Sequence, residues 1–372
     1  VVAHSGLPCI DKPYLVLGIE TSCDDTGVAV VSSTGKILSN IVISQREIHE
    51  EYGGIVPNLA MQEHKKNIDS AVTQALANAG VTMSEISGVG VTQGPGLEVC
   101  LRVGVRKAQA LCTEWKKPLS LVNHLEAHCL SARLTGVLPT SDDSADKQDL
   151  KPIPYPFLAL LASGGHTSLV LCNGISNYSI LGSTLDDALG EAFDKASRML
   201  QLSTGSNGGI MIEKAAENGR KGIFKLPVPL QKKMNCDFSY SGLKTSFRYT
   251  LEKLGDPKSL KPQTVSDICA SFQASAFRHV SDRVSHALRY IRNRRIPVSS
   301  IVVVGGVACN KELRSLIDKN AALYEQKLQV IFPPPALCTD NGVMVAWAAI
   351  EKFNLGLSDR IEDQDVFSRW PI

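Results

Sequence analysis

Two histidines lie four residues apart in Asn123-His124-Leu125-Glu126-Ala127-His128. On a helix this spacing places both imidazoles on one face, within reach of a single metal ion. Zinc proteases carry a general-base glutamate at the second position of such a motif, where this sequence has Leu125. The pattern therefore favours a metal site over a metalloprotease, although two helix histidines that line a surface have the same spacing. Asp340 is the candidate third ligand.

Two short polar turns form a second set of candidate sites. Glu20 to Gly27 separates apolar runs at 14–18 and 28–31, which predicts a strand-turn-strand hairpin with acids and hydroxyls at its tip. Ser163-Gly164-Gly165-His166-Thr167 separates runs at 157–162 and 168–172 in the same way. Glycine lets backbone amides approach a phosphate closely, but ordinary hairpin turns use the same residues. The repeated pattern suggests an internal duplication.

Further candidates follow in the second half of the chain. The run from Asp186 to Leu200 predicts a helix whose Asp194 can offer a carboxylate to a ribose. The stretch from Asp237 to Thr245 predicts a compact polar-aromatic loop of the kind that contacts RNA. A β-branched strand at 301–304 leads into Gly305-Gly306 and a helix. This junction resembles the adenosine-contacting element of the superfamily that joins actin, heat-shock chaperone ATPases and sugar kinases.

The whole chain has the composition of an ordinary globular protein. Its 372 residues are enough for two domains, and 44% of them are hydrophobic and 20% charged. The net charge of +2 means that a polyanionic partner must be met by local basic patches. The ten cysteines contain no CxxC pair, which indicates reduced thiols. No apolar run is long enough to span a membrane.

These patterns predict a two-domain α/β fold of the actin, chaperone-ATPase and sugar-kinase class, with a mixed sheet flanked by helices in each domain. We expect an N-terminal subdomain at 14–139, a polar, proline-rich linker at 140–156 and a nucleotide-binding subdomain at 157–345. The last segment, 346–372, should pack back on the first subdomain. The first residue is Val1 and not methionine, so we expect that a preceding segment, such as a tag or a targeting presequence, was removed.

An ordered set of motifs resembles the tRNA threonylcarbamoyladenosine synthase family, whose members were once described as sialoglycoprotein endopeptidases. The resemblance extends from about Tyr14 to Ile372 and rests on the motifs Gly18 to Asp24, Tyr52 to Pro57, Gly94 to Leu97, Asn123 to His128, Ser163 to Thr167, Asp237 to Thr245 and Cys338 to Asn341. The ending Arg369-Trp370-Pro371 is similar to that of the bacterial and mitochondrial branch. A mitochondrial member acting as a single chain would also explain a removed presequence, whereas a bacterial member would be cytoplasmic.

The resemblance implies a role for each candidate. One divalent metal, iron or zinc, would be bound by His124, His128 and Asp340. Threonylcarbamoyl-adenylate would come from a separate synthetase, and Asp24 would orient or deprotonate the accepting amine of the tRNA. The adenylate would be held by Ser163, Gly164, Gly165, His166, Asp194, Gly209, Glu213 and Asn310. The basic residues proposed to contact tRNA are Lys65, Lys66, Lys232, Lys233, Lys244 and Arg248, with Arg292, Arg294 and Arg295 as further candidates. A homodimer without membrane attachment is expected.

Two features depart from the family pattern, and three other functions remain open. The usual Tyr-Pro-Gly-Gly-Pro loop is replaced by Thr204 to Ile210, and the linker is longer and more polar than expected. A sugar kinase or ATPase of the same fold would explain the hairpins but gives the two histidines no role. A metalloprotease would need a general base, and this sequence has Leu125 at that position. A tRNA-binding scaffold without activity would need no metal ligands beside a nucleotide site.

Overall fold

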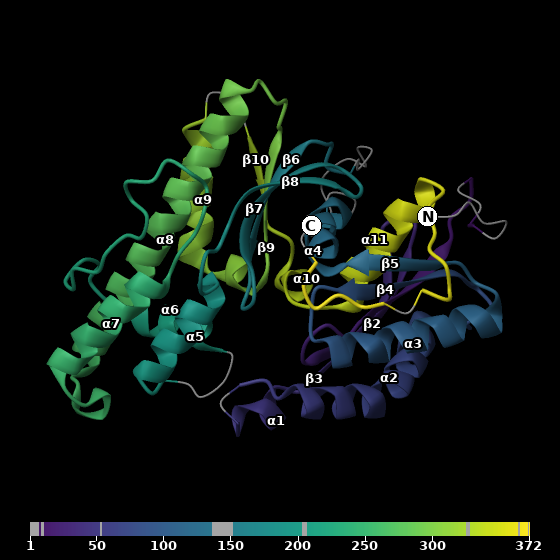
Figure 1. Cartoon of the computed structure of the whole chain (residues 1–372), viewed down its shortest axis with the longest axis horizontal. Coiled ribbons are helices and arrows are strands. Elements are labelled where there is room, and N and C mark those ends of the chain that lie inside the picture. The colour runs from purple at the N-terminus through teal and green to yellow at the C-terminus, as the bar shows by residue number, and fades with distance from the viewer. Residues whose placement is uncertain are drawn as a thin grey trace, which may run out of the picture. The chain divides into compact units, whose positions relative to one another are not determined.

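The computed structural model describes residues 7–8, 11–52, 54–135, 152–202, 207–324, 328–363, 365–370 and 372. Its contacts divide the chain into two units (Figure 1), one comprising the residues up to Ile153 and from Ala336 onward, and the other Pro154–Pro335. We call these unit 1 and unit 2. The return to unit 1 begins at Ala336, before the predicted residue 346, so Asp340 belongs to unit 1. Residues 140–151 of the predicted linker lie outside the described part.

Unit 1 is built on a five-stranded mixed sheet in the order β3-β2-β1-β4-β5. The strands are β1 (Leu15–Glu20), β2 (Asp25–Ser32), β3 (Ile37–Ser44), β4 (Ile86–Gly94) and β5 (Leu119–Asn123). β1, β2 and β3 pair antiparallel, whereas β4 and β5 continue the sheet in parallel from β1. The carboxyl ends of β1, β4 and β5 therefore meet at one edge, which is where ligands bind in sheets of this kind.

Helices cover this sheet, and their bounds follow from local signals. They are α1 (Arg46–Glu50), α2 (Pro57–Ala79), α3 (Glu98–Trp115), α4 (His124–Thr135) and α11 (Gly342–Asn354). α2 begins with proline in its first turn and ends at Gly80 in the left-handed conformation. α2 and α3 pack together, while α11 lies against α4 and strands β1, β2 and β4. The short helix α10 (Pro335–Cys338) lies at the boundary of the units.

Glycines allow α11 to approach the sheet closely. A Cβ added at Gly90 would lie 2.7 Å from the Cβ of Ala349, and one at Gly27 would lie 2.8 Å from the backbone nitrogen of Gly342. Gly18 also faces the backbone of Gly342. Because no side chain separates them, the first turn of α11 lies on β1 and β2. Asp340 precedes that turn and is thereby placed near the carboxyl end of β1.

Unit 2 repeats the same strand arrangement. Its sheet has the order β10-β9-β6-β7-β8, with β6, β7 and β8 antiparallel and β9 and β10 continuing in parallel from β6. The strands are β6 (Phe157–Ala162), β7 (Thr167–Gly174), β8 (Asn177–Ser183), β9 (Ser300–Val304) and β10 (Gln329–Ile331). The matching topology supports the predicted duplication. β6 and β9 are buried throughout, as expected for central strands.

The helices of unit 2 pack around the long helix α8. They are α5 (Leu189–Met199), α6 (Gly208–Ala216), α7 (Ser241–Leu254), α8 (Pro262–Asn293) and α9 (Lys311–Ala322), with 3-10 turns η1 (Pro257–Ser259) and η2 (Gly306–Cys309). α8 contacts α6, α7 and α9. Two predictions were wrong here. The helix predicted from Asp186 begins only at Leu189, and the loop predicted at 237–245 becomes helical from Ser241.

Candidate active site

The two histidines of the opening motif sit where β5 gives way to α4. Asn123 ends the strand, and its side-chain oxygen accepts hydrogen bonds from the backbone nitrogens of Leu125 (2.9 Å) and Glu126 (3.2 Å). This cap starts the helix at His124. His124 and His128 consequently lie on one face, with ring centroids 4.7 Å apart, and both are buried. The predicted helical setting of the pair is confirmed.

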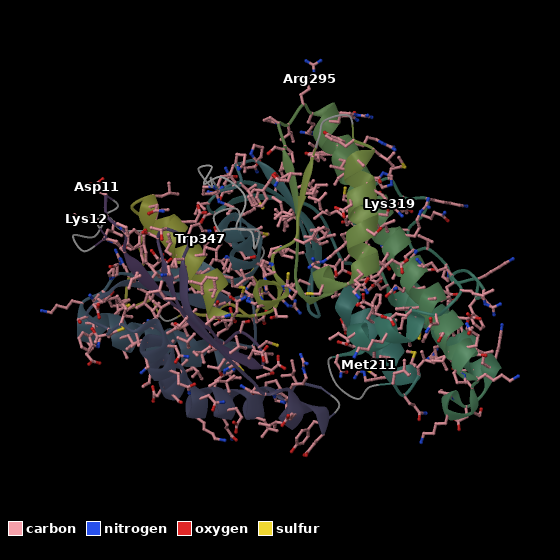
Figure 2. All side chains as sticks on the ribbon, turned by 180° about the vertical axis from the view of Figure 1, so that it is seen from behind. Asp11, Lys12, Met211, Arg295, Lys319 and Trp347 are labelled. Atoms are coloured by element: carbon pink, nitrogen blue, oxygen red, sulfur yellow. The ribbon has the colours of Figure 1, made fainter. Side chains whose placement is uncertain are left out.

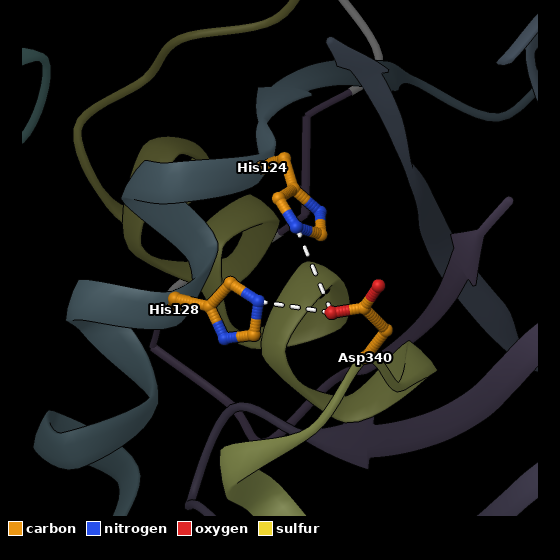
Figure 3. Close-up of side chains that lie close together, drawn as sticks. All are labelled: His124, His128 and Asp340. Atoms are coloured by element: carbon orange, nitrogen blue, oxygen red, sulfur yellow. Dashed lines mark hydrogen bonds and ion pairs between the residues drawn. The ribbon is translucent and has the colours of Figure 1, made fainter. Parts of the chain in front are cut away.

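Asp340 joins the two histidines from the segment before α11 (Figure 3). One of its carboxylate oxygens, Oδ1, lies 3.1 Å from Nε2 of His128 and 3.6 Å from Nε2 of His124. The donor atoms of the three residues all lie within 4.8 Å of one another. Nδ1 of His128 is buried without a hydrogen-bond partner among the described residues. Imidazole and carboxylate donors are ligands of zinc and iron, so this triad fits a divalent transition metal.

Glu20 supports His124 from behind. Its Oε2 lies 3.1 Å from Nδ1 of His124 and accepts the hydroxyl of Thr92 at 2.5 Å, while its Oε1 accepts the backbone N–H of Ser22 at 2.6 Å. Glu20 is fully buried at the end of β1. A carboxylate behind a metal-ligating histidine fixes the ring orientation and the tautomer. This residue was missed from the sequence, although a lone acid ending an apolar strand is a signal.

The charges of this cluster shift its pKa values. Burial alone would lower the pKa of His124, but the carboxylates of Glu20 and Asp340 outweigh it and raise the pKa to about 9. Burial would raise the pKa of Glu20, but His124 outweighs it and the pKa of Glu20 is lowered. The pair thus holds a proton on His124 when no metal competes for Nε2.

Glu126 faces away from the triad. Its Oε2 lies 3.6 Å from Nζ of Lys352 on α11, and its side chain is buried. A metalloprotease needs a carboxylate that can activate water at the metal. Glu126 is engaged elsewhere and Leu125 occupies the usual position of that base, so the geometry disfavours the protease alternative.

The β1–β2 hairpin places Asp24 and Asp25 at its tip, as predicted. Both residues are partly exposed, and the backbone nitrogen of Gln45 donates to the Asp24 carbonyl at 3.2 Å. Burial raises the pKa of Asp25 to about 6, and its Oδ1 is buried without a hydrogen-bond partner among the described residues. The hydroxyl of Ser22, in the same turn, lies 3.2 Å from Nδ1 of His124, which places the turn next to the triad.

The Ser163–Thr167 turn of unit 2 is open above its glycines. The backbone nitrogen of Ser163 donates to the His166 carbonyl (2.9 Å), and the His166 nitrogen donates to the Ser163 hydroxyl (3.0 Å). Nothing lies within 4 Å of a Cβ added at Gly164 or Gly165, and both are exposed. Gly190 at the start of α5 supports the turn from below, because its nitrogen donates to the Ser163 carbonyl at 3.1 Å.

The other predicted adenylate residues of unit 2 hold its helices together. Asp194 accepts the backbone N–H of Gly208 at 2.8 Å, where α6 begins, and Glu213 accepts that of Lys311 at 2.9 Å. Asn310 is buried and caps α9, its Oδ1 accepting the N–H groups of Glu312 and Leu313 at 3.0 and 3.2 Å. Gly209 has open space above it. Residues 204–206 of the atypical loop lie outside the described residues.

The predicted basic residues fall into several separate places. Lys65 and Lys66 are exposed on α2 of unit 1, and Lys232 and Lys233 are exposed in unit 2. Lys244 is only partly exposed and its Nζ lies 2.5 Å from Asp187. Arg248 pairs with Glu252, and Arg294 stacks on Tyr290. Arg292 lies near the end of α8, and Arg295 projects beyond that end (Figure 2). Lys244 thus already has a carboxylate partner.

The sequence of the chain is similar to that of one family of known proteins. The family model described as tRNA N6-adenosine threonylcarbamoyltransferase matches residues 36–347. A protein of that name from Methylocapsa acidiphila is 44% identical over 361 residues, covering 96% of both chains. A probable mitochondrial one from Arabidopsis thaliana is 40% identical, covering 99% of this chain and 77% of its own.

Solved structures share the fold at low sequence identity. T. kodakarensis HypF aligns with a TM-score of 0.54 at 14% identity, covering 95% of this chain and 49% of that one. Component A of the Acidaminococcus fermentans (R)-2-hydroxyglutaryl-CoA dehydratase aligns with a TM-score of 0.50 at 14% identity, covering 92% and 99%. The predicted fold class, a two-domain α/β fold with a helix-flanked mixed sheet in each domain, is confirmed. None of the described helices is both long and apolar enough to cross a bilayer.

Proposed function

The chain belongs to the tRNA N6-adenosine threonylcarbamoyltransferase family, and from this premise we propose which of its residues carry the reaction. The protein transfers the threonylcarbamoyl group from threonylcarbamoyl-AMP to N6 of adenosine 37 in ANN-decoding tRNAs. N6 attacks the carbamoyl carbon and forms a C–N bond, and the bond between that carbon and the phosphate oxygen of the adenylate breaks. AMP leaves with that electron pair, and N6 loses a proton.

The observation that carries the proposal is the convergence of His124, His128 and Asp340 on one point of unit 1. These three residues would bind one divalent metal, and iron or zinc suits their donors better than magnesium. A metal held by these residues would supply positive charge to polarise the carbonyl and neutralise phosphate. Glu20 holds His124 in the orientation in which Nε2 faces Asp340.

Asp24 is the proposed proton acceptor for the attacking amine. It lies, partly exposed, in the turn that directly follows Glu20 at the end of β1. An adenine amino group is a weak nucleophile that needs precise placement. A positioned carboxylate can take the proton as the C–N bond forms. Asp25 beside it has the raised pKa described above, and we assign it no proton transfer.

Unit 2 would bind the adenylate. The exposed backbone of Gly164 and Gly165 suits a phosphate, because no side chain covers it. The amides of Ser163 and His166 on either side already donate within the turn and hold its shape. The remaining proposed contacts are Asp194, Gly209, Glu213 and Asn310. Asp194 and Glu213 each use one carboxylate oxygen to accept a backbone hydrogen bond at the start of a helix. Asn310 is buried as a helix cap, so we assign it the role of shaping the site.

Contacts with tRNA are proposed for Lys65, Lys66, Lys232 and Lys233, which are exposed. They are proposed less directly for Lys244 and Arg248. These two already pair with acids, as Lys66 does with Glu63 at 3.3 Å. We further propose that a separate synthetase supplies threonylcarbamoyl-AMP and that the protein works as a homodimer. The relative from Methylocapsa acidiphila is bacterial, and the one from Arabidopsis thaliana is named mitochondrial. This supports a mitochondrial location, or a cytoplasmic one in a bacterium.

The direct test is a transfer assay. Metal-loaded protein is incubated with threonylcarbamoyl-AMP and an unmodified ANN-decoding tRNA, and the digested nucleosides are analysed by mass. We expect threonylcarbamoyladenosine and an equal amount of AMP. ATP turnover with a small hydroxylated acceptor and no modified nucleoside would instead match the kinase alternative, which the family membership does not favour.

The open glycines of unit 2 give a second expected result. Gly164→Ala and Gly165→Ala should leave the midpoint of urea unfolding nearly unchanged, because the new methyl group meets nothing within 4 Å. Each should raise the KM for threonylcarbamoyl-AMP about ten- to a hundred-fold, since losing one hydrogen bond to a charged group costs about 1.5–3 kcal/mol. Gly174→Ala on β7, whose added Cβ meets only Asn177 at 4.0 Å, is the control. An unchanged KM in both variants would remove this turn from the site.

A further inference from the structure

One buried histidine that the mechanism does not use lies directly behind the hairpin tip. His64 projects from α2 and is fully buried. Its Nδ1 lies 2.7 Å from the hydroxyl of Thr26, and its Nε2 lies 3.0 Å from the backbone carbonyl of Cys23. These two partners flank Asp24 and Asp25 in the sequence. One imidazole therefore holds both ends of the turn that carries the two acids.

The partners determine the protonation state of the ring. A carbonyl oxygen only accepts hydrogen bonds, so Nε2 must carry a hydrogen and donate to Cys23. In the neutral ring Nδ1 then accepts, and the Thr26 hydroxyl donates to it. Burial lowers the pKa of His64, which keeps this neutral form at physiological pH. Both ring nitrogens and the hydroxyl proton are thus satisfied inside the core.

His64 has no access to substrate, because none of its surface is exposed. The turn is also held by β3, because Asp25 and Thr26 pair with Ser44 and Ile43. The Gln45 nitrogen donates to the Asp24 carbonyl at 3.2 Å. On the far side, the Leu97 nitrogen donates to the Ser22 carbonyl at 2.8 Å. His64 is therefore the side chain that ties the turn to α2.

We propose that His64, through its hydrogen bonds to Cys23 and Thr26, is a positioning residue that fixes the turn presenting Asp24 to the tRNA amine. This inference rests on the proposed function of Asp24. A displacement of about 1 Å at a reacting group costs up to about a hundred-fold in rate. Thr26 is the sharper place to test it, because its hydroxyl can be removed without leaving a cavity.

The experiment compares Thr26→Val, Thr26→Ser and His64→Gln in the transfer assay. We expect Thr26→Val and His64→Gln to lower kcat about ten- to a hundred-fold, with metal content and the KM for threonylcarbamoyl-AMP within about two-fold of wild type. Thr26→Ser keeps the hydroxyl and should retain most of the activity. Val72→Ala, a core truncation on the same helix, is the control for lost stability. It should lower the unfolding temperature without lowering kcat at the assay temperature.

A double-mutant cycle separates positioning from a general structural effect. In an Asp24→Asn background, Thr26→Val should cause no further loss of kcat, because the group it positions is gone. Full additivity, or a Thr26→Val kcat equal to wild type, would overturn the proposal. A wild-type protein that makes no threonylcarbamoyladenosine would instead count against the proposed function. If His64→Gln fails to fold, Thr26→Val and Thr26→Ser still decide the outcome.

Discussion

His128→Ala is expected to abolish metal binding and to lower kcat/KM for threonylcarbamoyl transfer about a thousand-fold. His128 supplies a nitrogen 3.1 Å from Asp340, and without it two donors remain. A bound metal contributes several kcal/mol of transition-state stabilisation, and each 1.36 kcal/mol is a factor of about ten in rate. The metal content is measured by elemental analysis after dialysis, and the rate by quantifying threonylcarbamoyladenosine.

The control for this result is His286→Ala, which removes a partly buried histidine from α8 of unit 2. It should bind metal and transfer the group as the wild type does. His124→Ala should match His128→Ala. If His128→Ala loses its metal but transfers at the wild-type rate, the metal has no part in catalysis and the family role assigned to the triad is wrong for this chain.

The triad could be anticipated from the sequence only in part. The spacing of His124 and His128 predicts a shared face on local grounds alone. Asp340 lies far along the chain and was only a candidate until the family resemblance supported it, because spacing carries no information about a ligand brought in by another element. Its position depends on glycines of β1, β2 and β4, which let α11 lie on the sheet. Such a close contact has no periodic signature in the sequence.

Continuous apolar runs predicted the strands β1, β2, β6, β7 and β9, whereas the edge strands β3 and β8 were missed. β6 and β9 are buried along their whole length, so their hydrophobic residues are uninterrupted. β3 and β8 lie next to the hairpins, with mixed buried and exposed residues that include serine, asparagine and glycine. Their strand geometry comes from pairing with β2 and β7, a tertiary effect that local pattern does not contain.

The acids at 186–194 show why helix patterns mislead near a helix start. Asp186 lies before α5 and accepts hydrogen bonds from the hydroxyls of Ser239 and Ser241 and from the backbone nitrogen of Tyr240, at 2.5, 2.7 and 2.7 Å. It therefore caps α7 from a distant part of the chain. Asp187 pairs with Lys195 and Lys244. Capping between distant segments appears in a sequence only as an acidic run, which is also typical of an exposed helix face.

Glu20→Gln is expected to weaken metal binding about 10- to 100-fold, although all three proposed metal ligands remain in place. Three donors converge on the carboxylate, namely the Ser22 N–H, the Thr92 hydroxyl and Nδ1 of His124. An amide has one oxygen and one NH₂ group, so the NH₂ must face a donor in either orientation. If the NH₂ group faces Ser22, it meets a backbone N–H that can only donate, and no hydrogen bond forms. If the NH₂ group faces His124, it donates to Nδ1 and favours the tautomer that carries its hydrogen on Nε2, where the metal would bind.

The measurement for Glu20→Gln is the metal dissociation constant by competition with a chelator, followed by transfer rates over a range of metal concentrations. The lost activity should return at saturating metal, because the three ligands remain. Glu126→Gln is the matched control, since Glu126 is an equally buried acid that pairs with Lys352 outside the triad. It should change stability more than metal affinity. Equal metal affinities in Glu20→Gln and the wild type would mean that packing alone orients His124, and that the carboxylate behind it serves only to compensate buried charge.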